Sequence, residues 1–87
     1  MKQPLNYAIL LYFTKHEEGD ADSIMEELRP EYGGYRAFKR KGVVEALMTA
    51  KENGILDEVR AELAEGDVLR MWYKLSDYGT ELIARFL

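Results

Sequence analysis

Residues 57 to 75 alternate between apolar and charged side chains on both sides of a short turn that contains a glycine. In the first run the apolar positions are Val59, Ala61 and Leu63, and in the second they are Leu69, Met71, Tyr73 and Leu75. Alternate side chains of a strand point to opposite faces, so this pattern predicts two antiparallel strands over 56–63 and 68–75. Gly66 suits the tight turn between them, because glycine tolerates positive φ. The second half of the chain is therefore built around a β-hairpin.

The register of this hairpin follows from the rule that opposed residues share a face. On the inner face it pairs Leu63 with Leu69 and Ala61 with Met71. On the outer face it sets two opposite-charge pairs around a cation–aromatic pair: Glu62 with Arg70, Arg60 with Trp72, and Glu58 with Lys74. Each such pair contributes a few tenths of a kcal/mol and up to about 1 kcal/mol. We therefore expect both cations of the second strand to be paired with carboxylates of the first.

Helical spacing of apolar residues predicts four helices around the hairpin, over 4–16, 22–29, 37–53 and 77–86. Pro4 suits a first helical turn, and Pro30 should end the second helix because the residue before a proline avoids helical angles. Gly54 supplies a C-terminal stop for the third helix, and Ser76 can cap the last. Gly42 costs about 1 kcal/mol relative to alanine inside a helix, so we expect a break or an irregular turn near it.

Length and composition limit the class of protein. The chain has 87 residues, which fits a single domain over 1–87, and it has no cysteine for a disulfide or a thiolate metal site. Its longest apolar stretch, residues 7–13, is far too short to span a bilayer, and we expect no cleavable leader. No glycine-rich phosphate cradle or carboxylate pair marks an active site. We expect a cytoplasmic protein that is not an enzyme and binds no cofactor, no metal and no membrane.

The order of these elements resembles the winged helix-turn-helix regulators, particularly the PadR-type and MarR-type families. Residues 46–56 look like the end of the recognition helix of such a domain, and residues 72–82 are similar to its second wing strand running into a capped helix. The resemblance covers nearly the whole chain. It implies an α+β fold, a winged helix-turn-helix with three helices, a two-stranded β-hairpin wing and a C-terminal helix.

The resemblance also implies a DNA-binding transcriptional regulator that acts as a homodimer on double-stranded DNA without a cofactor. These families place the third helix in the major groove. The corresponding part of this chain holds four cations with no acid between Arg36 and Val44. They are Arg36, Lys39, Arg40 and Lys41, called the basic cluster below. We predict that the basic cluster is the DNA-binding site; the alternative is a solvated turn that balances the acidic second helix through ion pairs.

The charge of the chain favours a different function. The net charge is -4, whereas duplex-binding modules usually carry surplus cations because phosphate neutralisation supplies most of their affinity. The second helix carries Asp22, Glu26 and Glu27, and the predicted wing tip is Glu65-Gly66-Asp67. If the chain binds DNA, the basic cluster must therefore supply nearly all of the contact. The alternative is a winged-helix protein–protein interaction module with an acidic binding surface, a basic protein partner, Trp72 as an anchor and no DNA binding.

Overall fold

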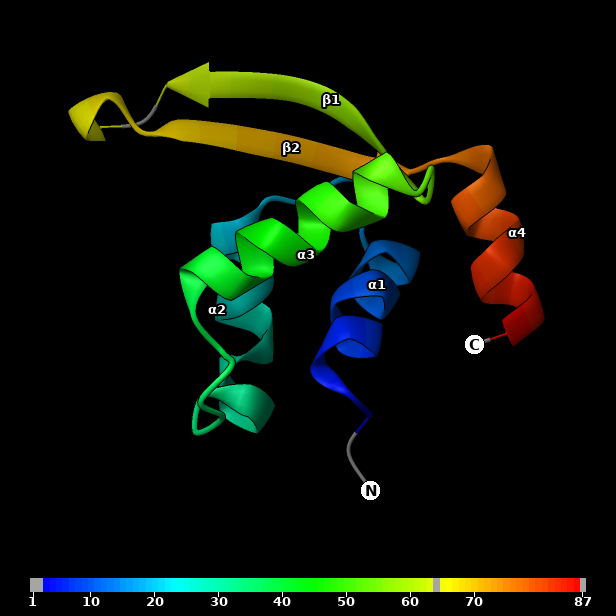
Figure 1. Ribbon diagram of the computed structural model, residues 1–87, viewed down its shortest axis with the longest axis horizontal. Helices are drawn as coiled ribbons and strands as arrows, with labels where there is room; N and C mark the ends of the chain where they lie inside the picture. Colours follow the sequence, from blue (N-terminus) through cyan, green and yellow to red (C-terminus); the bar gives the residue numbers. More distant parts are fainter. Residues whose placement is uncertain (1–2, 64, 87) are drawn as a thin grey trace.

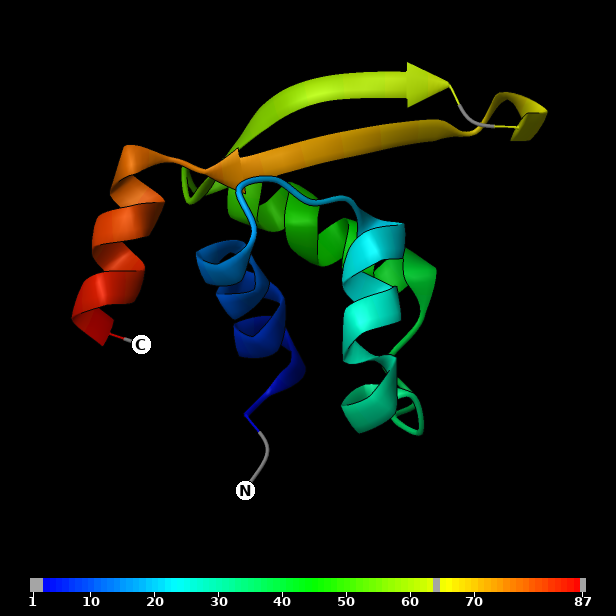
Figure 2. The ribbon, with the colours of Figure 1, turned by 180° about the vertical axis from the view of Figure 1, so that it is seen from behind.

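The computed structural model describes residues 3–63 and 65–86 (Figure 1). The elements in chain order are α1 (Leu5–Lys15), α2 (Ala21–Tyr32), α3 (Arg40–Glu52), β1 (Leu56–Leu63), a short 3-10 turn (Glu65–Asp67), β2 (Leu69–Leu75) and α4 (Asp77–Phe86). The hairpin of β1 and β2 lies along α3, and α1 and α2 pack on another side of that helix (Figures 1 and 2). This arrangement confirms the expected α+β fold. Within the described ranges, no helix combines the length and apolar character needed to cross a membrane.

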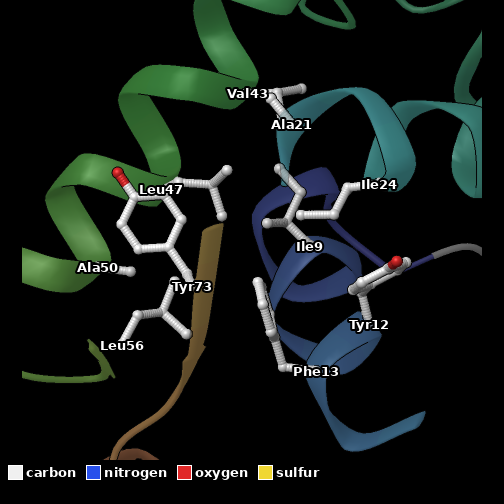
Figure 3. Close-up of a cluster of buried hydrophobic side chains, with 10 residues drawn as sticks. All are labelled: Ile9, Tyr12, Phe13, Ala21, Ile24, Val43, Leu47, Ala50, Leu56 and Tyr73. Atoms are coloured by element: carbon white, nitrogen blue, oxygen red, sulfur yellow. The ribbon is translucent and has the colours of Figure 1, made fainter. Parts of the chain in front are cut away.

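The main core is a cluster of buried side chains contributed by α1, α2, α3 and the base of the hairpin (Figure 3). Its members are Ile9, Tyr12, Phe13, Ala21, Ile24, Val43, Leu47, Ala50, Leu56 and Tyr73. Val43 and Leu47 lie one turn apart on the inner face of α3 and are almost completely buried. Burying one such aliphatic side chain stabilises the fold by about 1.5–3 kcal/mol, so this face of α3 is firmly held and the opposite face is left to solvent.

The second helix is longer than the sequence predicts. The prediction that Pro30 ends it was wrong, because α2 continues through Pro30 to Tyr32. Proline removes only one hydrogen bond near a helix end, and the last turn is held by other contacts. Tyr32 is buried in a second apolar cluster with Ala8 and Phe38, and its hydroxyl donates to the carbonyl oxygen of Gln3 at 2.5 Å. Burial of Tyr32 thus keeps the helix intact beyond the proline.

The third helix begins later than the sequence predicts. It was expected from residue 37, but α3 starts at Arg40, so Arg36 and Lys39 lie in the connection before it. The buried side chain of Phe38 holds this connection against the second cluster, and Lys39 has extended backbone angles, φ -132° and ψ 151°. The predicted break at Gly42 is also wrong, because α3 runs without interruption and Gly42 falls in its first turn.

The hairpin register confirms four of the five predicted pairs. Those found are Leu63 with Leu69, Ala61 with Met71, Glu62 opposite Arg70, and Arg60 opposite Trp72. The fifth was wrong, because Glu58 lies opposite Tyr73 and not Lys74. The register shifts between Glu58 and Arg60, which leaves Val59 as a β-bulge. Strict alternation in the sequence contains no sign of the extra residue.

Candidate nucleic-acid interface

The outer face of α3 carries little positive charge. Lys41, Glu45, Met48 and Glu52 are all exposed, and their spacing places them in one line along the helix, away from the buried Val43. Only the first of the four is a cation, and two are carboxylates. The positive charge of this face is therefore confined to the N-terminal end of α3, and the rest of the face is acidic and apolar.

The structure brings the whole basic cluster to that N-terminal end. Arg36 and Lys39 lie in the connection before α3, and Arg40 and Lys41 lie in its first turn, all with exposed side chains. Among the residues that the structure describes, Arg36, Lys39 and Lys41 form no ion pair. Three of the four cations are therefore available to a ligand.

Arg40 differs from the other three because it already has a carboxylate partner. Its Nε donates to Oδ1 of Asp22 at 2.9 Å, and both side chains are about half exposed. Asp22 lies in the first turn of α2. For this one residue the structure agrees with the alternative interpretation, in which the cluster balances the acidic second helix.

The N-terminus of α3 lacks the stabilising groups that a helix start normally has. Its N-cap residue, Lys39, makes no side-chain capping bond, and no acidic residue lies in the first turn. The N-terminus of α2 is the opposite case: Asp20 accepts a bond from the backbone N–H of Ser23, and Asp22 follows in the first turn. Helix dipoles favour anions at this end, so the cations and uncapped amides of α3 form a site suited to a negatively charged ligand.

The wing cations bind other partners than the sequence predicts. Arg70 was expected to pair with Glu62, but its Nε donates to Oδ2 of Asp20 at 2.5 Å. The Asp20 side chain is fully buried, so its charge requires compensation more strongly than the exposed carboxylate of Glu62, which bonds to Arg60 at 2.9 Å. Glu58 likewise pairs with Lys51 at 2.9 Å and not with Lys74. These partners come from α3 and from the segment before α2, which strand pairing does not reveal.

Trp72 is covered by cations and is not free to anchor a partner. The guanidinium of Arg60 lies 4.3 Å from the ring centroid, which confirms the predicted cation–aromatic pair, and that of Arg70 lies 5.4 Å away. Arg60 is in turn bound to the carboxylate of Glu18. The indole is only partly accessible, so the predicted role of Trp72 as an anchor for a protein partner does not fit its surroundings.

The distal half of the wing is apolar and acidic. Leu63 is 74% exposed and Leu69 54% exposed, and they face each other across the hairpin. Met48 of α3 is 50% exposed, and it lines a cavity of about 80 Å³ between α3 and β2 together with Leu69. These three residues are called the apolar strip below; Leu69 connects them, because it faces Leu63 across the hairpin and lines the same cavity as Met48.

Comparison with known proteins supports the fold. The chain matches no family model and no curated protein by sequence. Seventeen chains of solved structures match it in three dimensions. Among them is Bacillus subtilis PadR in complex with operator DNA, with a TM-score of 0.73 and 22% sequence identity over 94% of this chain. The match covers 45% of the PadR chain, so this chain corresponds to less than half of that protein's length. The chain therefore has a winged-helix fold of the kind seen in PadR.

Proposed function

We propose that this chain is a winged-helix DNA-binding protein that regulates transcription and contacts DNA through the basic cluster. The observation that carries this proposal is the concentration of unpaired cations at the uncapped N-terminus of α3. A phosphate placed there would be bound by Lys39 and Lys41 and by the exposed amides of the first turn. The similarity to PadR, which was solved with operator DNA, supports the same function.

The charge distribution favours an end-on approach of α3 to the duplex. Glu45 and Glu52 would face phosphates if the helix lay along the groove with its full length. Recognition helices commonly contact base edges with their N-terminal residues, and Arg36 or Arg40 could donate to a guanine edge from this position. We infer that phosphate contacts supply most of the affinity and that few bases are read.

We further infer that the protein acts as a homodimer on a roughly two-fold operator. Tyr78, Leu82 and Phe86 follow one another at four-residue spacing on α4, so they share one side of that helix. Phe86 is 70% exposed and Tyr78 55% exposed, which makes this side of α4 the candidate surface for the partner subunit.

The proposal predicts a salt-dependent affinity for DNA that depends on the basic cluster. The measurement is fluorescence anisotropy of a random-sequence duplex of about 20 base pairs, at about 50 and about 200 mM salt. Replacing Arg36, Lys39 and Lys41 together by alanine should lower the magnitude of the salt slope by about 3, because up to three phosphate contacts are lost. At low salt we expect affinity to fall about 100-fold or more.

A matched control separates this effect from a change in net charge. The triple alanine replacement of Lys15, Lys74 and Arg85 removes the same charge from exposed positions on α1, β2 and α4. We expect it to weaken binding only slightly and to leave the slope unchanged. Equal losses in the two triple variants, or no binding by the wild-type protein at either salt, would contradict the proposal.

A second function is favoured by the apolar strip, which is unusual on a surface meant for phosphates. On α3, Met48 is flanked by the exposed carboxylates of Glu45 and Glu52. Exposed apolar surface next to these carboxylates fits a protein segment that carries both apolar and cationic side chains. We therefore keep, as the second candidate, an interaction module that binds a basic and apolar segment of another protein.

This second function predicts binding of a peptide with alternating lysine and leucine, measured through the fluorescence of Trp72. Because the apolar strip supplies part of the contact, Leu63→Ser combined with Leu69→Ser should weaken binding about tenfold or more. A peptide of alternating lysine and serine is the control, since it retains the charge and lacks the apolar side chains. Equal affinity for the two peptides, or an unchanged affinity in the variant, would count against this function.

A further inference from the structure

The carboxylate of Asp22 lies between two guanidinium groups that belong to different elements. Its Oδ1 accepts a hydrogen bond from Nε of Arg40 on α3 at 2.9 Å. Its Oδ2 is 3.8 Å from Nε of Arg70 on β2, which is too long for a hydrogen bond. Arg40 and Arg70 also line the same small cavity between α3 and β2. One carboxylate is thus bonded to the first cation and within reach of the second.

The two guanidiniums differ in how firmly they are held. Arg70 is fixed by the fully buried carboxylate of Asp20 at 2.5 Å. Arg40 has Asp22 as its only carboxylate partner in the described part of the chain, and that pair is about half exposed on both sides. Exposed ion pairs are weak because water screens them. The bond between Arg40 and Asp22 is therefore the one that a competing anion can break.

We propose that Asp22 is an exchangeable counter-ion for Arg40, which it releases to a DNA phosphate while turning toward Arg70. This inference rests on the proposed DNA-binding function. The single N–H of Arg70 Nε is already donated to Asp20, so Asp22 would gain a closer ion pair with this guanidinium and a hydrogen bond from one of its terminal NH2 groups; the 3.8 Å separation leaves a movement of about 1 Å to make. The carboxylate then keeps a cationic partner after Arg40 has left it, so the exchange leaves no charge uncompensated. Asp22 remains close to the bound phosphate, however, and its charge still opposes binding.

The exchange makes Asp22 a residue that sets DNA affinity without touching DNA. Asp22→Asn should bind the random-sequence duplex about threefold more tightly at about 50 mM salt, since a competing ion pair of modest strength is lost. The salt slope should not change, because Arg40 reaches the same phosphate in both proteins. Glu81→Gln, which removes one exposed carboxylate from α4, is the matched control and should show no gain.

A double-mutant cycle tests whether Asp22 acts through Arg40. Arg40→Ala alone should lower the magnitude of the salt slope by about 1, and Asp22→Asn should give a clearly smaller gain in that background, since only the repulsion between Asp22 and the phosphate is then removed. Each variant is first checked by circular dichroism for an unchanged melting temperature.

Each remaining outcome would overturn the inference in a different way. An equal gain from Asp22→Asn with and without Arg40 would mean that Asp22 only repels DNA. A gain accompanied by a steeper slope would mean that Arg40 never leaves Asp22 in the wild-type protein. Unchanged affinity in Asp22→Asn, with normal wild-type binding, would overturn this inference alone. Absence of wild-type binding at both salts would overturn the proposed function and this inference together.

Discussion

Gly79→Ala is expected to destabilise the protein by about 2–4 kcal/mol, although alanine is the better helix former. Gly79 is buried in the first turn of α4. A Cβ at this position would lie 2.1 Å from the carbonyl oxygen of Ile55 and 2.9 Å from its carbonyl carbon. Both are backbone atoms, so no side chain can rotate away to make room. The clash should outweigh the helix propensity gain of about 1 kcal/mol.

The local hydrogen bonds prevent α4 from moving back to relieve this clash. The Ser76 hydroxyl accepts a bond from the N–H of Gly79 at 2.9 Å, and the N–H of Ser76 donates to the same Ile55 carbonyl at 3.0 Å. Any shift that makes room for the methyl group would therefore break the N-terminal cap of the helix. The bend at 54–55 and the start of α4 form one rigid joint.

Urea denaturation followed by circular dichroism measures the effect of Gly79→Ala. Gly34→Ala is the matched control, because a Cβ there meets no atom within 4 Å. We expect Gly34→Ala to change stability by no more than about 0.5–1 kcal/mol, in the stabilising direction if at all. Equal midpoints for the Gly79 variant and the wild-type protein would show that α4 is not docked as described.

Asp20→Ala is expected to cost about 2–4 kcal/mol, because two roles are lost at once. The fully buried carboxylate caps α2 by accepting a bond from the Ser23 N–H at 3.3 Å, and it binds Arg70 at 2.5 Å. A lost N-cap alone costs about 1 kcal/mol. The remainder comes from Arg70, which would keep only the more distant Asp22 as a carboxylate partner among the described residues. Asp20→Asn preserves the shape and part of the cap, so its cost should be smaller.

The effect of Asp20 should also depend on pH. Burial raises the pKa of this carboxyl, but the hydrogen bonds from Ser23 and Arg70 and the charge of Arg70 outweigh it, so the net pKa lies below the ordinary value of 3.8. A depressed pKa in the folded state means that the ionised group stabilises the fold above about pH 4, and that this stability is lost as the pH falls through the folded pKa. Urea midpoints of the wild-type protein and Asp20→Asn should therefore differ at pH 6, and the difference should shrink as the pH falls below about 4. A constant difference would exclude ionisation of Asp20 as its source.

The hairpin and its register were predictable because apolar and charged side chains alternate along each strand with a period of two residues. When the inner face of a strand is apolar, a shift of one residue would move its apolar side chains to the solvent face, so the register is fixed. This rule alone predicts that Leu63 pairs with Leu69, as the structure shows. The bulge at Val59 was not predictable, since an inserted residue leaves the alternation on each side intact. The resemblance to winged-helix families added the expected order of helices, which the alternation alone does not supply.

The errors concern contacts between residues that are far apart in the sequence. The helix α2 passes through Pro30 because Tyr32 packs against Ala8, and α3 starts late because Phe38 joins the same cluster. Arg70 pairs with Asp20, which lies fifty residues earlier in the chain. The sequence places the basic cluster in one stretch of the chain, but only the structure shows that Arg40 is bonded to Asp22. Local patterns predict elements well and predict the partners of their charged side chains poorly.

The bulge in β1 bears on how these molecules behave at high concentration. Among the described residues, β1 has β2 as its only neighbour in the sheet, so the peptide groups along its other edge face solvent. An open edge of eight residues could template intermolecular sheet growth and aggregation. The extra residue at Val59 disrupts the regular spacing of donors and acceptors, and the charges of Glu58 and Arg60 flank it. We therefore expect this irregularity to oppose edge-to-edge pairing between the wings of separate molecules.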